Sequence, residues 1–189
     1  MSKKVMGIDP SMRSTGICIA HENKYKYILI PSAPTKKLLN FKHKSLEILN
    51  YEPESVKDKT SVGKEMAIAS NIKSIVDRIE QLIKKHKPDY IVIESCAFAA
   101  AGRVADLSGL NHCIRYVAAR VGVPCYAVVS TTNKLLFTGN GQATKEMMVE
   151  SWKVCDPVAR DIVAIGKSAE DLADAFSLSL FPEERLKIR

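Results

Sequence analysis

VMGIDPSMRSTG, residues 5–16, joins a short apolar run to an acid, a proline and a polar turn. The four residues from Val5 to Ile8 are typical of a buried strand, and Asp9 ends that strand. A buried strand gains no stability from an acid at its carboxyl end. Asp9 therefore either opens a turn before Pro10 or is held where a ligand arrives.

The elements that follow this stretch predict an α/β fold. Turn signals divide the first thirty residues into strands at about 4–9, 15–20 and 25–31, which form an antiparallel meander. DYIVIES (89–95) is a continuous apolar run, as in strands covered on both faces. A further strand is expected at 124–129, with helices at about 61–86, 104–121, 131–136, 144–154 and 169–181. This order predicts a mixed sheet of three antiparallel and then parallel strands, with helices on both faces.

The bulk properties predict one domain over residues 1–189. The chain is 46% hydrophobic, which suits a single core, and its net charge of +7 favours acidic partners such as nucleic acid. Residues 31–60 hold three prolines and the basic run TKKLLNFKHK, so we expect an insertion outside the core, and about 182–189 a short charged tail. Neither a secretory pattern nor a membrane-spanning apolar run is present, which predicts a cytoplasmic protein without a membrane partner.

Three further acids stand where a ligand site would need them. Glu94 ends the strand within DYIVIES, just as Asp9 ends the first strand. Ligands bind at the carboxyl ends of parallel strands in open α/β sheets, so neighbouring strands would bring these two carboxylates together. In SAEDLADAFSLSLF (168–181), Asp171 and Asp174 are three residues apart, on one face of a helix. Four carboxylates would then converge.

Each acid taken singly also has a structural explanation. Asp9 would open a turn, Glu94 would be a surface acid at a strand end, and Asp171 would favour a helix amino terminus. Asp174 fits such explanations less well, because it lies beyond the first turn among apolar neighbours. Like charges at this spacing repel each other unless a cation intervenes.

The chemistry of this donor set indicates Mg²⁺ or Mn²⁺. Oxygen ligands without a matching set of histidines or cysteines suit these ions better than zinc. Two such ions clamp a scissile phosphate, lower the pKa of an attacking water and stabilise the leaving oxygen. The acids therefore predict phosphodiester hydrolysis, with Asp9 as a metal ligand held on rigid strand backbone.

Four ordered motifs resemble those of the RuvC-type Holliday junction resolvases of the ribonuclease H-like superfamily. They are an Asp-Pro followed by Arg and Thr-Gly, an apolar strand ending in Ile-Glu, two spaced lysines, and an Asp-x-x-Asp-Ala helix. The resemblance covers most of the chain apart from the insertion and the last residues. The matching residues are Asp9, Pro10, Arg13, Thr15, Gly16, Glu94, Lys134, Lys145, Asp171, Asp174 and Ala175.

The resemblance implies a metal-dependent endodeoxyribonuclease that resolves four-way (Holliday) junctions by symmetric nicks, without a nucleotide cofactor. Asp9, Glu94, Asp171 and Asp174 would bind two Mg²⁺ ions per active site, for which Mn²⁺ would substitute, and would activate water. Lys145 would stabilise the developing charge on the phosphate.

The resemblance also implies contacts to DNA and a second copy of the chain. Lys134 would hold the DNA backbone, Arg13 belongs to the DNA-binding motif, and Phe98 resembles an aromatic that stacks on opened bases, although a core phenylalanine fits equally well. The family acts as a homodimer, and RVADLSGLNHCIRYVAARVG (103–122) carries small and apolar residues on more than one face. A core helix with one buried side is the alternative.

Two departures from the family's pattern bear on the substrate. Ser11 replaces the glycine usual after Asp-Pro, so the turn must avoid backbone angles that only glycine tolerates. The segment at about 31–60 is longer than in the bacterial enzymes, which indicates a phage-type or otherwise divergent member, active in the host cytoplasm if phage-encoded. Its lysines would add a duplex contact or form a solvated loop; they are Lys36, Lys37, Lys42, Lys44, Lys57 and Lys59.

Three other functions remain alternatives. A broader branched-DNA endonuclease would cut flaps and forks as well as junctions. A junction-binding protein without catalysis would have lost a carboxylate, yet all four are present. An actin-like or sugar-kinase-type ATPase also opens with a strand, an aspartate and a phosphate-gripping hairpin, but it needs two domains and a second glycine-rich phosphate loop, which this chain does not offer.

Overall fold

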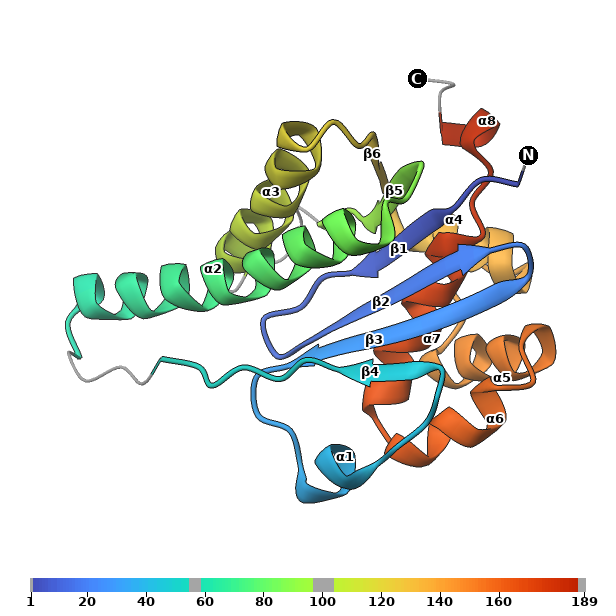
Figure 1. Ribbon diagram of the computed structural model, residues 1–189, viewed down its shortest axis with the longest axis horizontal. Coiled ribbons are helices and arrows are strands. Elements are labelled where there is room, and N and C mark those ends of the chain that lie inside the picture. Colours follow the sequence, from blue (N-terminus) through green and yellow to red (C-terminus); the bar gives the residue numbers. More distant parts are fainter. Residues whose placement is uncertain (1, 55–58, 97–103, 187–189) are drawn as a thin grey trace.

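The computed structural model describes residues 2–54, 59–96 and 104–186 of the chain. Its sheet has six strands in the order β4-β3-β2-β1-β5-β6 (Figure 1). β1, β2 and β3 form an antiparallel meander, and β5 and β6 continue from β1 as parallel strands. The predicted mixed sheet is therefore confirmed. The strands are β1 (Val5–Asp9), β2 (Ser14–His21), β3 (Lys24–Pro31), β4 (Leu46–Ile48), β5 (Tyr90–Glu94) and β6 (Cys125–Val128).

Helices cover both faces of the sheet, as the sequence predicts (Figure 1). The isoleucines of β1, β2 and β3 that point to one face pack against α2 and α3. The alternating residues of β2 and β3, such as Cys18 and Tyr27, pack against α5, α6 and α7 on the other face. The helical elements are α1 (Lys36–Asn40), α2 (Ser61–His86), α3 (Val104–Arg120), α4 (Ser130–Thr138), α5 (Lys145–Cys155), α6 (Ala159–Ile162), the 3₁₀ turn η1 (Val163–Ile165), α7 (Ser168–Ser179) and α8 (Glu183–Leu186).

Two glycines let α7 lie directly against the strands. A Cβ placed on Gly7 of β1 would come within 2.1 Å of the Ala175 carbonyl oxygen, and one placed on Gly16 of β2 within 2.2 Å of the Asp171 carbonyl oxygen. Real Cβ atoms do not approach other atoms so closely, so any larger residue would push the helix away from the sheet. This close packing fixes the position of α7 on β1 and β2, from Asp171 to Ser179.

The prediction that residues 31–60 lie outside the core is wrong. β4 pairs in parallel with β3 and extends the sheet by one strand. Leu38 and Tyr51 are buried, each in the core on one side of the sheet. The Tyr51 hydroxyl also donates a hydrogen bond to the Met12 carbonyl oxygen at 2.9 Å. A strand of three residues and isolated apolar side chains give no periodic pattern. The prediction of a loop therefore rested only on the prolines and lysines of the segment.

A buried polar network fastens α5 to β3. The Tyr27 hydroxyl donates to the Asp156 carboxylate at 2.5 Å and accepts from Trp152 Nε1 at 2.9 Å. Asp156 also accepts from the Val158 amide, which starts the turn after α5. Burial raises the pKa of Tyr27, so the phenol remains a donor.

We expect Tyr27→Phe to lower the free energy of unfolding by about 2 kcal/mol, because it leaves the buried Trp152 donor unpaired and removes a donor to Asp156. Urea denaturation measures this difference. Tyr25→Phe is the matched control, since the Tyr25 ring packs on Phe176 and its hydroxyl makes no hydrogen bond to the described residues. Equal losses in the two variants would contradict a role for the network.

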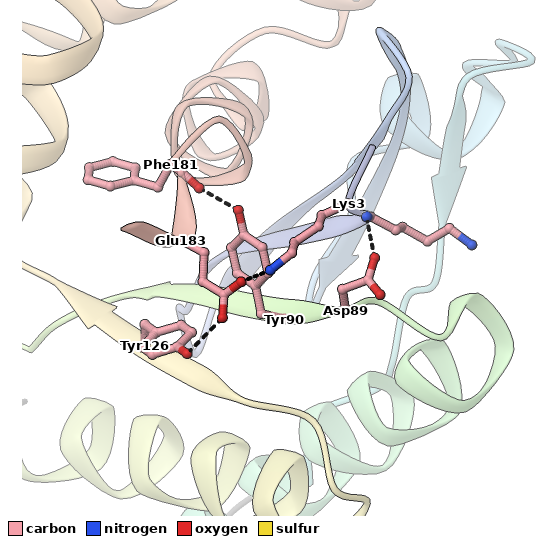
Figure 2. A network of polar contacts seen from close by, with 7 residues as sticks. Lys3, Asp89, Tyr90, Tyr126, Phe181 and Glu183 are labelled. Atoms are coloured by element: carbon pink, nitrogen blue, oxygen red, sulfur yellow. Dashed lines mark hydrogen bonds and ion pairs between the residues drawn. The ribbon is translucent and has the colours of Figure 1, made fainter. Parts of the chain in front are cut away.

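A second polar network closes the end of the sheet where β1 and β5 begin (Figure 2). Tyr90 donates to the Phe181 carbonyl oxygen at 2.7 Å, and the Lys4 amide donates to Asp89 at 2.6 Å. Lys3 pairs with Glu183, which also accepts from Tyr126. These contacts bind the chain after α7 to the amino ends of the strands, and they leave the carboxyl ends of β1 and β5 open.

Within the described residues, no helix combines the length and apolar content needed to cross a membrane.

Candidate active site

The carboxyl ends of two neighbouring parallel strands bring Asp9 and Glu94 together. Ile8 of β1 pairs with Ile93 of β5, so the acids that follow them lie side by side at the same edge of the sheet. Asp9 also pairs with Gly16 of β2, the residue that lies against the Asp171 backbone. The helix α7 thereby presents Asp171 and Asp174 beside the two strand ends. We call Asp9, Glu94, Asp171 and Asp174 the carboxylate cluster.

Burial and mutual repulsion disfavour the charged forms of these acids. Burial raises the pKa of Asp9 well above its usual value, and the charges of Glu94, Asp174 and Asp171 raise it further. Burial also raises the pKa of Asp174, to about 7, and Glu94 adds to this effect. The like charges that raise the pKa of Asp9 and of Asp174 in this way store repulsion that a bound cation would relieve.

We expect the free energy of unfolding of the metal-free protein to fall as the pH rises from about 5 to 8. The folded pKa of Asp174, about 7, lies above the unfolded value, so the folded state holds a proton that the unfolded chain releases. Asp174 makes its full contribution to the free energy of unfolding below the unfolded pKa. That contribution is lost as the pH rises through 7, and the loss is on the order of 2 kcal/mol. Urea denaturation in chelator measures it, and Asp174→Asn should flatten the profile. The same slope in both proteins would contradict the assignment.

Both predicted lysines lie beside the carboxylate cluster. Lys134 of α4 and Lys145 of α5 each lower the pKa of Glu94 and of Asp174, which places their ammonium groups within electrostatic reach of these acids. Lys145 also lowers the pKa of Asp171, against the larger effect of burial. The structure therefore brings two cations from separate helices to one group of acids.

A cleft of about 530 Å³ opens next to Asp9 and Glu94. Its walls come from the turn after β1, the chain after β5, the helix α3 and the start of α4. Pro10, Leu107 and Val129 give it an apolar side. It is wide enough to admit part of a nucleotide chain next to the acids.

The sequence analysis missed two asparagines that support the site. Asn111 of α3 is buried on the wall of the cleft, and its side-chain amide donates to the Glu94 carbonyl oxygen at 2.7 Å. Asn133 of α4 is fully buried and accepts from the Ser177 hydroxyl at 2.9 Å, one turn of α7 beyond Asp174. Each asparagine lies on the buried side of a predicted helix, and a buried polar side chain needs a hydrogen-bond partner. The sequence indicates that such a partner exists but does not identify it.

The turn after Asp9 explains how serine replaces glycine. The Ser11 carbonyl oxygen accepts from the Thr15 hydroxyl at 2.8 Å, and the Ser11 amide donates to the same hydroxyl at 3.1 Å. Ser11 is not among the residues with positive φ, as expected for a residue other than glycine. Arg13 lies exposed in this turn, and no described contact joins its guanidinium to the carboxylate cluster. Phe98 lies outside the described residues.

The chemistry of the cluster fits a hard divalent cation, although the side chains do not yet converge on one point. Across residues 2–54, 59–96 and 104–186, no three His, Cys, Asp or Glu side chains are placed so that together they hold a metal ion. The donors are nevertheless all carboxylate oxygens, and burial opposes their ionisation without a counter-charge. Such a set fits Mg²⁺ or Mn²⁺ if the side chains rotate toward a shared ion.

Comparisons with known proteins find relatives among the crossover junction endodeoxyribonucleases. No protein-family profile matches the chain. A crossover junction endodeoxyribonuclease RuvC of Sulfurovum sp. (strain NBC37-1) is 25% identical over 187 residues, which cover 98% of each chain. Among solved structures, RuvC of T. thermophilus in complex with Holliday junction substrate aligns with 94% of this chain and 91% of its own, at a TM-score of 0.60 and 19% identity. The Fowlpox virus resolvase with junction DNA covers 97% and 99%, at a TM-score of 0.51 and 12% identity.

The mixed sheet and these likenesses give the protein the ribonuclease H-like fold of the RuvC-type enzymes. Within that fold class, the chain is a distant homologue, over nearly its whole length, of the RuvC-type Holliday junction resolvases.

Proposed function

We propose that this protein is a DNA endonuclease that resolves four-way junctions by metal-dependent phosphodiester hydrolysis. The observation that carries the proposal is the meeting of four acids and two lysines, from five separate elements, at the open edge of the sheet. The full-length likeness to crossover junction endodeoxyribonucleases supports the same reaction.

In this proposal the carboxylate cluster holds two Mg²⁺ ions, for which Mn²⁺ would substitute. Asp9 and Glu94 sit on strand ends and supply the rigid side of the site, while Asp171 and Asp174 approach it from α7. The chemistry that such ions supply is the activation of water and the neutralisation of charge on the scissile phosphate.

The basic side chains and the cleft hold the DNA. Lys145 offers an ammonium group close to the acids, where negative charge develops on the phosphate during hydrolysis. Lys134, within electrostatic reach of Glu94, would contact a neighbouring phosphate, with Arg13 in the exposed turn as a further contact. Pro10, Leu107 and Val129 would cover the apolar parts of the strand that enters the cleft.

A homodimer would place one such site on each of two strands. The helix α3 buries one side in the core through Leu110, Ile114 and Val117. Next to this buried side, the helix exposes Cys113 and Tyr116, the latter 66% exposed. A second copy packed on these exposed residues would give the assembly two-fold symmetry, which suits symmetric nicks at a four-way junction.

The proposal is tested with a labelled synthetic four-way junction, next to a linear duplex and a flap, in Mg²⁺ and in chelator. We expect symmetric cuts near the junction centre that require the metal, and tight binding without cuts in chelator. Equal cutting of the flap would identify a broader branched-DNA endonuclease. Junction binding without cuts in Mg²⁺ would contradict the enzymatic function.

A further inference from the structure

Lys145 makes an ion pair with Glu170, an acid that the site described above does not use. Lys145 Nζ lies 3.0 Å from Glu170 Oε2, and the two side chains are 54% and 23% exposed. Glu170 directly precedes Asp171 in α7, so the pair lies at the rim of the carboxylate cluster. A hollow of about 560 Å³ beside the pair gives solvent, and so a DNA strand, access to it.

Lys145 occupies an unfavourable place in its own helix. It is the first residue of α5, directly after Thr144, whose side chain accepts a hydrogen bond from the Met147 amide. The amino end of a helix carries partial positive charge, which disfavours a cation there. Glu170 lies in the first turn of α7, where negative charge is favoured. The lysine therefore depends on a partner from another element, and Glu170 is placed to be that partner.

The ion pair also restricts a side chain that is otherwise mobile. A lysine has four rotatable side-chain bonds and loses substantial entropy when it is held in one position. The ion pair with Glu170 thus limits the positions that the Lys145 ammonium group can take.

We propose that Glu170 is a positioning residue, whose carboxylate holds the Lys145 ammonium at the rim of the carboxylate cluster before DNA binds. The inference rests on the proposed function, because it gives Glu170 a part in cleavage through Lys145. It adds a residue and a role to that function: Glu170 itself need touch neither DNA nor metal.

Single-turnover and steady-state cleavage of the four-way junction in Mg²⁺ provide the first test. We expect Glu170→Gln to lower kcat about tenfold and to leave KM within about twofold, because a misplaced cation affects the transition state more than binding. Glu170→Asp, which keeps the charge on a shorter side chain, should recover part of kcat. Asp77→Asn is the matched control, since it removes a carboxylate charge from an exposed pair with Lys73 on α2, away from this hollow; its kcat should equal that of the native protein.

A double-mutant cycle separates positioning from a general effect on the fold. In a Lys145→Ala background, Glu170→Gln should cause no further loss of kcat, because the group on which it acts is gone. Losses that multiply in the double variant would overturn the proposal, as would a native kcat in Glu170→Gln or a change confined to KM.

Lysine acetylation tests the ion pair without any cleavage. With acetic anhydride in limiting amount, mass spectrometry should show Lys145 reacting several-fold faster in Glu170→Gln than in the native protein, with Lys134 unchanged. Equal Lys145 rates in the two proteins would overturn the proposal even if the enzyme cuts junctions. Faster Lys145 labelling in a protein that cuts no junction would instead refute the proposed function, and with it the catalytic role of Glu170.

Discussion

Asp174→Asn is expected to lower the rate of junction cleavage by about a thousandfold or more while, at pH 8, where Asp174 is charged, it raises the melting temperature of the metal-free protein. The amide is nearly the same size as the carboxylate but cannot carry the charge that would hold Mg²⁺. It also removes one of the like charges that raise the pKa of Asp9. Catalysis and stability therefore change in opposite directions, which is typical of an acid retained for function.

Cleavage under single-turnover conditions and differential scanning calorimetry in chelator measure the two effects. Asp77→Asn, on the exposed side of α2, is the matched control and should change neither the cleavage rate nor the melting temperature by much. A cleavage rate for Asp174→Asn within tenfold of the native rate would remove Asp174 from the metal site. A lower melting temperature in chelator would contradict the repulsion between the acids.

Gly16→Ala is expected to destabilise the protein by about 3 kcal/mol or more and to reduce cleavage strongly. The added Cβ would lie 2.2 Å from the Asp171 carbonyl oxygen and 2.6 Å from its carbonyl carbon. The atoms that the added Cβ meets belong to the Asp171 backbone and its Cβ. None of them is the end of a flexible side chain, so α7 must shift away from β2. Because Asp171 and Asp174 move with this helix, the same shift takes two acids away from Asp9.

Urea denaturation and Mg²⁺-dependent cleavage test this expectation. Gly109→Ala is the control: among the described parts of the chain, its Cβ would meet only Ile72 Cδ1, at 3.5 Å, and alanine favours the helix. Native stability and cleavage in Gly16→Ala would show that the helix approaches the strand with more freedom than the structure indicates.

Much of the site could be predicted because its acids are tied to local patterns. Asp9 and Glu94 each end an apolar run, and the spacing of Asp171 and Asp174 fixes their common helix face. The two asparagines and Glu170 escaped the analysis because each depends on one distant partner. Asn111 reaches the backbone of Glu94, and Glu170 pairs with Lys145 on another helix. A polar residue in a helix gives no sign of which distant group it will meet.

The sequence alone was enough to predict five of the six strands, the long helices and the kind of donor atom at the four acids, because the periodicity of apolar residues and the identity of side chains are local properties. It also indicated the wrong place for residues 31–60, where β4 is too short for a period to appear. Only the tertiary structure decided that β1 and β5 are neighbours, so that Asp9 lies beside Glu94. It also decided that α7 rests on Gly7 and Gly16, since strand pairing and close packing depend on the shape of the whole core.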